Sequence, residues 1–390
     1  MLCNKTVCTG CASCYNVCPT NAITMNEDSE GFLRPCIDES KCVHCGLCEK
    51  CCPELNPVNL FPVPDSVYAC WSLDDSTRMS SSSGGVFSEL AHATIRNGGI
   101  VFASGCDEEL HLHFRGIEKE SDLGFAQQSK YWQSDIRDSF MEIKKALREN
   151  RPVLFVGTPC QVAGLRAFLG AMSNSPYLCA VDLICGSVPS PGVFRKYTDY
   201  LRSVFGQDVR SINMRDKAKS WEFPRTSIIL RSGKKQTLRG KYDWFKTGFY
   251  LYLFCRPCCE HCRYTLKSRV GDITIGDYWG IGGLEPFPFS KKKGVSVVLC
   301  NSPKGEDSFA MIKDYCFTSK RKIEELTQPA LHRPVRFNRR RTQFFSDFEK
   351  ESIEQVILKY FKRNWKLRLR SAIASILPAA VCSLFLKRKK

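Results

Sequence analysis

Eight cysteines near the N-terminus fall into two copies of one spacing, Cys-x2-Cys-x2-Cys-x3-Cys-Pro. The copies are CTGCASCYNVCP at 8–19 and CVHCGLCEKCCP at 42–53. Three thiolates on one tight loop suit the corner of a four-iron, four-sulfur cluster, and the fourth cysteine serves the opposite cluster. The sequence therefore predicts two clusters, one held by Cys8, Cys11, Cys14 and Cys52 and the other by Cys42, Cys45, Cys48 and Cys18.

A pair of zinc sites is the alternative interpretation of these eight cysteines. Zinc sites usually combine two separated Cys-x2-Cys pairs, whereas here consecutive Cys-x2 steps are followed by Cys-x3-Cys-Pro. Two complete copies of that longer spacing favour the cluster interpretation. Cys3, Cys36 and Cys51 have no partner spacing of this kind, so we expect them to be bystanders.

A run of small residues, Met79 to Gly85, leads directly into an amphipathic segment that begins at Val86. Free backbone amides at the positive end of a helix bind phosphate or pyrophosphate, and Ser82, Ser83, Gly84 and Gly85 are placed for that contact. A serine N-cap with flexible glycines would produce the same pattern. On this feature alone both interpretations stay open.

More cysteines follow in the second third of the chain. Cys160 lies just after a predicted strand at 153–156, and Cys185 closes another at 178–184. Both would lie at the carboxyl ends of adjacent strands, where open α/β sheets build their sites. The later run CRPCCEHC at 255–262 suits zinc and an iron–sulfur cluster equally well by spacing. Cys160 and Cys185 supply two missing thiolates and favour a third cluster.

The elements that would position these residues alternate between strand and helix, which is an α/β pattern. From residue 211 the pattern becomes more strand-rich, so the expected class is α+β overall. Strands are predicted at 67–73, 100–103, 153–156, 178–184, 226–230, 272–275 and 295–299, and helices at 86–96, 139–149, 161–169 and 193–205.

The last segment is strongly basic and helical. Residues 319–390 hold 19 Lys and Arg against 6 Asp and Glu, so they supply most of the formal charge of +17. One apolar stripe is expected from Phe345 to Phe361. The apolar run 372–386 is shorter than the roughly 20 residues that span a bilayer. For the role of this segment, we expect first a solvated or packing helix, and second peripheral contact with a membrane surface or an acidic partner. Nucleic-acid binding comes last, because no motif for it accompanies the charge.

Composition limits the class of protein further. The chain has 390 residues with 43% hydrophobic and 25% charged residues, which is typical of a globular protein of two or three domains. It has 23 cysteines, yet the N-terminal residues lack the apolar stretch of an export signal. We therefore expect a reducing cytoplasmic location, where closely spaced cysteines are metal ligands more often than disulfides.

Six motifs occur in order across residues 80–281, namely SSSGGVFSELA, SKYWQSDI, VLFVGTPCQVAGLRAFL, DLICGSVPSP, CRPCCEHCRY and DITIGDYWGI. In these motifs the chain resembles the β-subunit family of coenzyme F420 (deazaflavin) hydrogenases and dehydrogenases, with a ferredoxin module in front. The resemblance covers about two thirds of the chain. It implies domains at 1–62 (two-cluster ferredoxin type), 65–150 and 151–334 (the two parts of an α/β flavin-binding domain), and 335–390 (basic helical tail).

The resemblance also implies a cofactor set and a function. FAD would lie beside an inner four-iron cluster, making three such clusters in all. The chain would be a flavin-dependent oxidoreductase that passes electrons between a carrier, such as ferredoxin or reduced deazaflavin, and a substrate. Fused relatives tend to occur in gene sets for surface polysaccharides, and a partner enzyme subunit is expected. The inner cluster would be held by Cys160, Cys185, Cys259 and Cys262, and the flavin by Ser82, Ser83, Gly84, Gly85, Lys130, Gln161, Gly276, Asp277 and Trp279.

Two positions depart from the family pattern. Gly186 and Ser187 stand where His-Gly usually follows the cysteine, and Gln128 stands where a glycine usually precedes Ser-Lys-Tyr. Both departures affect the expected deazaflavin specificity more than the cofactor set. The rival interpretation is a flavin-free electron carrier or adaptor subunit of a larger redox complex, against which the serine–glycine loop and the GTPC motif argue.

Overall fold

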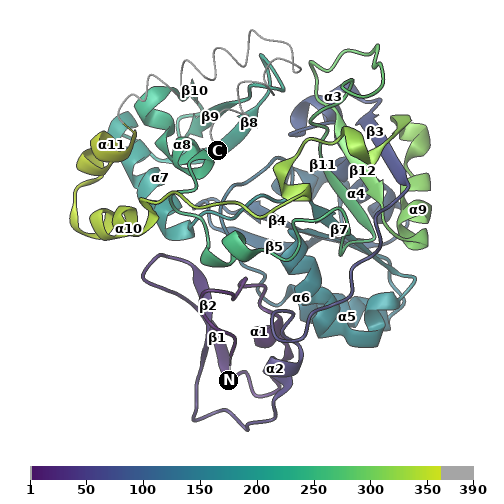
Figure 1. Ribbon diagram of the computed structural model, residues 1–390, viewed down its shortest axis with the longest axis horizontal. Helices are drawn as coiled ribbons and strands as arrows, with labels where there is room; N and C mark the ends of the chain where they lie inside the picture. The colour runs from purple at the N-terminus through teal and green to yellow at the C-terminus, as the bar shows by residue number, and fades with distance from the viewer. Residues whose placement is uncertain (1, 362–390) are drawn as a thin grey trace.

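A computed structural model of the chain describes residues 2–361. It has the mixed α/β architecture, α+β overall, that the sequence predicts (Figure 1). The strands are β1 (Ile23–Glu27), β2 (Leu33–Ile37), β3 (Ser66–Ser72), β4 (Ile100–Cys106), β5 (Leu112–Ile117), β6 (Val153–Gly157), β7 (Leu178–Leu183), β8 (Val209–Asp216), β9 (Arg225–Leu230), β10 (Lys235–Thr237), β11 (Ile273–Asp277), β12 (Ser296–Cys300) and β13 (Cys316–Arg321). The α-helices are α1 (Ser13–Val17), α2 (Leu47–Lys50), α3 (Asp75–Ser80), α4 (Val86–Arg96), α5 (Ser139–Arg148), α6 (Pro159–Leu169), α7 (Pro191–Phe205), α8 (Trp244–Tyr250), α9 (Pro303–Ala310), α10 (Arg341–Lys350) and α11 (Ile353–Phe361).

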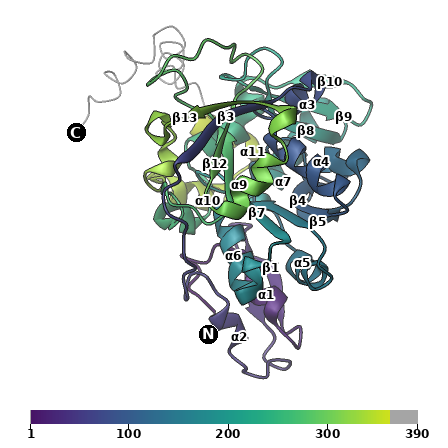
Figure 2. The same ribbon diagram turned by 90° about the vertical axis from the view of Figure 1, so that its right-hand side faces the viewer.

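The cysteine-rich N-terminal module lies at one end of the molecule, in purple in Figures 1 and 2. Its frame is the antiparallel hairpin β1–β2, with the short helices α1 and α2 beside it. The two cysteine loops share one backbone pattern. Gly10 and Ala12 have positive φ in the first loop, and His44 and Gly46 have it at the matching positions of the second. Two left-handed residues in such a short loop curl it around a central point, as a shared ligand requires.

The body is built on an eight-stranded mixed sheet in the order β13-β3-β12-β11-β7-β6-β4-β5. Its centre, β4, β6, β7 and β11, is parallel, and the outer strands pair antiparallel. Side chains alternate between two buried faces. Val101 packs with α4 and α9 on one face, whereas Phe102 packs with α5 and α6 on the other. Burial on both faces explains the nearly continuous apolar runs that identified the central strands in the sequence.

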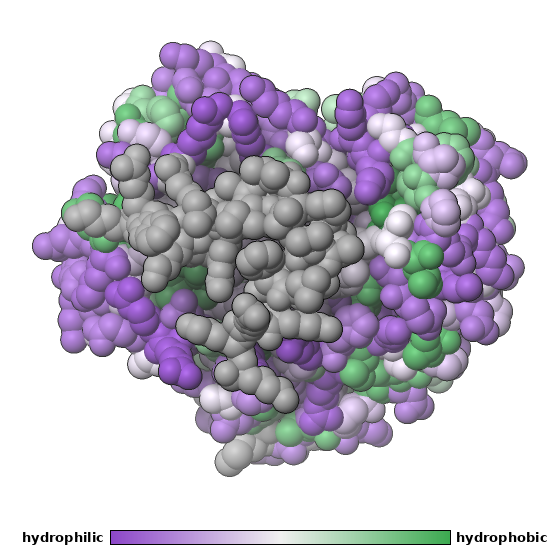
Figure 3. Space-filling view, turned by 45° about the horizontal axis from the view of Figure 1, so that its top comes forward, coloured by the Kyte–Doolittle hydropathy of each residue, from purple (hydrophilic) through white to green (hydrophobic). Residues whose placement is uncertain are grey.

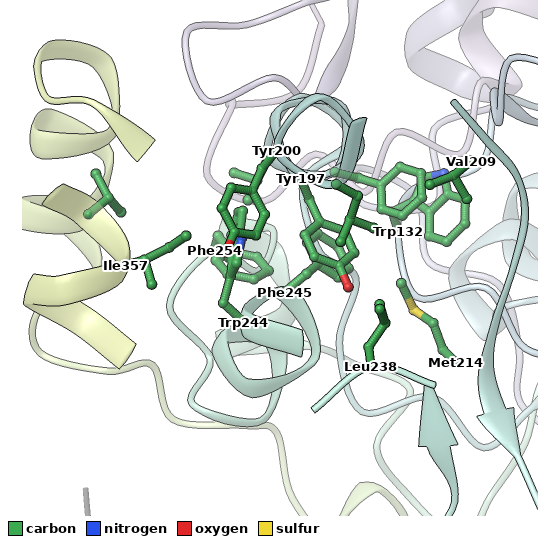
Figure 4. Packing of buried hydrophobic residues seen from close by; sticks show 14 of the residues in the cluster. Trp132, Tyr197, Tyr200, Val209, Met214, Leu238, Trp244, Phe245, Phe254 and Ile357 are labelled. Carbon is green, nitrogen blue, oxygen red and sulfur yellow. The ribbon is translucent and has the colours of Figure 1, made fainter. Parts of the chain in front are cut away.

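A smaller lobe contains the three-stranded sheet β10-β9-β8 together with α7, α8, α10 and α11. Its core is aromatic, and in Figure 4 Ile357 of α11 points toward Trp244 of α8 and Tyr200 of α7. The predicted apolar stripe of the basic segment, including Phe348 and Tyr360, therefore packs into the body as far as residue 361. The expected run 372–386 lies outside the described residues.

The molecular face in Figure 3 is mainly hydrophilic, with hydrophobic residues scattered over it in small groups. Within residues 2–361, no helix has the length and hydropathy required to cross a bilayer.

Candidate functional site

The structure brings the cysteines of the N-terminal module together in two groups. Cys8, Cys11, Cys14 and Cys52 line one cavity, and Cys18, Cys42, Cys45 and Cys48 line a second. The fourth cysteine of each group comes from the other sequence copy, which is the crossed arrangement expected from the spacing. Cys48 lines both cavities, so the two groups share a wall.

The chemistry of the first group suits a metal cluster. Burial raises the pKa of Cys11 to about 12, and burial followed by neighbouring thiols raises the pKa of Cys14 still further. Thiols buried together cannot all ionise unless a cation compensates their charge, and the irons of a cluster would do so. The donor set therefore fits a four-iron cluster.

The bystander cysteines have different environments. Cys3 lines the first cavity together with Cys8 and Cys52, a position that its isolated place in the sequence did not indicate. Cys51 is buried inside the module, where Ser13 Oγ donates to its carbonyl oxygen at 3.0 Å. Cys36 is exposed.

A third group of cysteines lies where α6, the end of β7 and the turn at 257–261 meet. β6 and β7 are adjacent and parallel, so Cys160 and Cys185 follow neighbouring strand ends, as predicted. Together with the 255–262 run they line a cavity of about 170 Å³. The cysteines of this cavity are Cys160, Cys185, Cys258, Cys259 and Cys262.

Five thiols therefore surround a site for which four ligands were expected. Cys258 is the additional one, and it lies next to Cys259 in the cavity wall. Cys255 does not line the cavity; its Sγ accepts a hydrogen bond from Ser187 Oγ at 3.3 Å. Burial raises the pKa of Cys160 and Cys185 well above the ordinary thiol value, so this donor set also suits a cationic cluster.

A larger cavity of about 310 Å³ adjoins the third group, within the size range of cofactor sites. It lies between the start of α4 and the ends of β6, β7 and β11. Most residues expected to contact a flavin line it, namely Ser82, Ser83, Gly85, Lys130, Gln161, Gly276 and Asp277.

Two expected flavin contacts are not brought to this cavity. Gly84 lies behind the loop, where its N–H donates to Ser296 Oγ at 2.8 Å. Trp279 follows the end of β11 and stacks on Trp221, with 4.7 Å between ring centroids. The chain turns away after Asp277, which carries the indole into a separate hydrophobic cluster.

Three polar residues of the cavity wall are already engaged by the protein. Lys130 Nζ donates to Gln127 O at 2.5 Å, and burial lowers its pKa to about 8. Gln161 Oε1 caps the start of α6, accepting from the Thr158 amide at 2.9 Å. The Asp277 carboxylate forms an ion pair with Arg215 at 2.9 Å. These residues shape the wall. In the serine–glycine loop, Ser82 Oγ accepts from the Ser129 amide at 2.8 Å and Ser83 Oγ donates to Val295 O at 2.9 Å, whereas the N-terminal amides of α4 have no side-chain cap.

The loop also has positive charge directly behind it. Lys217 Nζ donates to the carbonyl oxygens of Ser83 and Arg78, and Arg78 donates to Gly294 O. Within residues 2–361 neither cation forms an ion pair with a carboxylate. Burial lowers the pKa of Arg78 to about 10, and burial with the Arg78 charge lowers the pKa of Lys217 to about 7. Nothing in the loop's sequence revealed these two residues.

The four cavities form a connected series. The second cysteine group, which is the outer one, shares Cys48 with the first group. The first group shares Thr9 and Glu54 with the third group, which is the inner one. The inner group and the large cavity share the segment 185–188. Cys11 also packs directly against α6, because a methyl group at Gly164 would lie 2.7 Å from Cys11 Cβ. The series runs from the outer edge of the module to the serine–glycine loop.

Residues 7–55 match the family described as 4Fe-4S dicluster domain, which makes the chain an iron–sulfur protein with a ferredoxin-type module. Residues 150–325 match the family that describes the C-terminal part of the coenzyme F420 hydrogenase/dehydrogenase β-subunits. The second match confirms, over residues 150–325, the β-subunit family that the ordered motifs predicted, and the two matches together support an iron–sulfur electron-transfer protein of an oxidoreductase family.

A similar solved structure is the F420-reducing NiFe hydrogenase complex from Methanosarcina barkeri. The two chains are 18% identical, the alignment covers 69% of this chain and 85% of that chain, and the TM-score is 0.45. No curated protein matches the chain.

Proposed function

We propose that the chain is an iron–sulfur flavoprotein oxidoreductase that passes electrons between a redox carrier and a substrate. The observation that carries this proposal is the connected series of three thiol-lined sites and one large cavity. A flavin-free carrier would need the thiol-lined sites alone. The large cavity at their inner end has the size and wall chemistry of a cofactor site.

The residues proposed to hold the three four-iron clusters are those expected from the sequence, with Cys160, Cys185, Cys259 and Cys262 at the inner site. Cys258 lies beside Cys259 and stays a competing fourth ligand there. When bound, clusters supply one-electron chemistry, and FAD supplies the exchange between one-electron and two-electron chemistry. The protein contributes the fixed spacing between sites, because neighbouring sites share walls.

FAD binding is supported by the serine–glycine loop. Gly85 precedes α4 with φ +98°, and this eleven-residue helix has no side-chain cap on its N-terminal amides. A side chain at Gly84 would collide with Cys70 O at 2.3 Å, so the loop lies flat on the sheet. The amides and the positive charge of Arg78 and Lys217 favour the diphosphate of FAD there.

The proposed entry point for electrons is the outer edge of the module. Around the second cysteine group, Val43 and Leu47 are 61% and 38% exposed, and Cys45 is also exposed. A carrier such as ferredoxin or reduced deazaflavin, or a partner enzyme subunit, would dock on this edge. A link to surface-polysaccharide synthesis, and peripheral membrane contact through residues 335–390, are proposals that rest on resemblance and charge alone.

The test is an anaerobic electron-transfer assay on the full chain reconstituted with iron, sulfide and FAD. Reduced ferredoxin, reduced deazaflavin and nicotinamides are offered in turn, and the flavin absorption band is followed. At least one carrier should bleach the band. The variant Cys45→Ser should slow that bleaching, because Cys45 belongs to the outermost group, whereas Cys36→Ser is the matched control at an exposed cysteine outside all groups. A chain that retains no flavin after reconstitution supports the adaptor interpretation instead.

A further inference from the structure

The body of the protein places one buried guanidinium against the first cysteine group. Arg256 is 1% exposed and follows Cys255 in the 255–262 run. Its Nε donates to Cys8 O at 2.9 Å, and Nη2 lies 3.7 Å from Cys8 Sγ. Nη2 also donates to Leu33 O at 3.0 Å, so the group spans the cysteine loop and the β1–β2 hairpin.

No carboxylate within the described residues 2–361 balances this charge. Arg256 forms no ion pair there, whereas nearby Arg34 pairs with Asp28 at 2.9 Å. The acidic group that lines the first cavity is Glu54, and it pairs with Arg263 at 3.5 Å. A buried cation needs a compensating negative charge, and the thiolates of Cys8 and its partners are the groups within reach.

A second buried donor points at the same loop. Gln133 is 6% exposed, and its Oε1 accepts from Arg256 Nη1 at 2.9 Å and from the Leu33 amide at 3.0 Å. Its Nε2 has no hydrogen-bond partner among the described residues. A side chain at Gly10 would lie only 2.5 Å from that nitrogen, so the free N–H group faces the cysteine loop. An unpartnered buried donor of this kind indicates an acceptor that the cluster sulfur atoms would supply.

We propose that Arg256, held by Gln133, is the counter-charge of the first cluster and raises its reduction potential. The inference rests on the proposed function, because it assumes a four-iron cluster on Cys8, Cys11, Cys14 and Cys52. Reduction adds one electron and no proton to a cluster that already carries net negative charge. A positive charge and an N–H donor next to a ligand sulfur stabilise the reduced state more than the oxidised state.

Because of Arg256, the reduction potential of the first cluster depends on the docking of the N-terminal module against the body. The arginine comes from the body, and both of its backbone partners in the module lie in the cysteine loop and the hairpin. Its charge acts on Cys258 of the inner group as well as on Cys8. Arg256 is therefore a positioning residue between the first and inner sites, and separation of the module would remove its effect from the first cluster.

The test is an anaerobic redox titration of the full reconstituted chain, with the first cluster followed by electron paramagnetic resonance. Arg256→Gln should lower the equilibrium constant for reduction of that cluster at least tenfold, which is 59 mV for one electron. Arg256→Lys should restore most of the difference. Gln133→Glu keeps the size of the side chain and adds a negative charge, so it should lower the potential without removing the arginine.

The matched control is Arg341→Gln. Arg341 joins the same two parts of the molecule by donating to Glu30 at 2.8 Å and to Cys255 O at 3.0 Å, but it does not contact the cysteines of the first group. In this control, the equilibrium constant for reduction of the first cluster should stay within twofold of that of the unaltered chain. If the cluster assembles and its reduction potential is unchanged in both Arg256→Gln and Gln133→Glu, the inference is overturned and the proposed function is not affected. If Arg256→Gln does not fold, Gln133→Glu decides. Absence of the first cluster from the unaltered chain would overturn the proposed function as well.

Discussion

Replacing Gly164 with alanine tests how closely the first cysteine group is fixed to the body. The added methyl group would lie 2.7 Å from Cys11 Cβ and 2.9 Å from Cys11 Sγ. Carbon atoms pack best at about 3.5–4.0 Å, so the loop must move by about 1 Å. Overpacking of this kind costs about 1–3 kcal/mol, and the better helix propensity of alanine offsets up to about 1 kcal/mol of it.

We therefore expect Gly164→Ala to lose about 1–2 kcal/mol in the free energy of unfolding, because the strain exceeds the gain in helix propensity. It should also lose about four irons per chain, the content of one cluster. The assays are an anaerobic urea titration and an iron count after reconstitution.

The control is Gly124→Ala, where the added group meets open space, and it should change stability by less than about 0.5 kcal/mol. A Gly164→Ala chain with full iron content and undiminished stability would refute the close contact between Cys11 and α6.

Three further predictions concern charge. Asp182→Ala leaves Arg269 buried without its partner, an ion pair at 2.7 Å with both side chains almost fully enclosed; urea titration should show a loss of about 3–5 kcal/mol, and a loss below about 1 kcal/mol would contradict the buried pair. Lys217 has its pKa lowered to about 7, and an anion on the serine–glycine loop would raise it. Affinity for FAD, whose diphosphate keeps a constant charge in this range, should then be full below pH 7 and fall as pH rises, and a flat calorimetric profile from pH 6 to 9 would exclude this linkage. Glu30→Ala removes the partner of Arg341 and should speed proteolysis of the 53–65 linker about fivefold, corresponding to about 1 kcal/mol; an unchanged rate would mean that this ion pair does not hold the module.

Much of the candidate site could be predicted from the sequence because its signals are local. Each cysteine loop encodes its own shape, and the apolar runs that become β6 and β7 fix where Cys160 and Cys185 emerge. Cys258 could not be separated from Cys259 by spacing alone. Neighbouring residues on a short turn, which differ in spacing by one, can both reach the same cavity.

The contacts that could not be predicted join residues far apart in the chain. Arg256 reaches Cys8 across 248 positions, and Lys217 reaches Ser83 across 134. Neither lies in a pattern that marks a ligand. The helices α10 and α11 were expected as part of a basic tail, yet their apolar faces complete the core of the smaller lobe. Tertiary packing decides these placements, and the local periodicity of a sequence does not indicate which surface a helix packs against.

The most direct test of the proposed clusters and flavin is a count of cofactors in the full chain, reconstituted and handled without oxygen. Iron and acid-labile sulfide are measured per chain, and flavin is released by denaturation and identified. About twelve irons and one FAD are expected per chain, given four irons per site. About eight irons would remove the inner cluster, and absence of FAD would leave an electron carrier whose large cavity serves some other purpose.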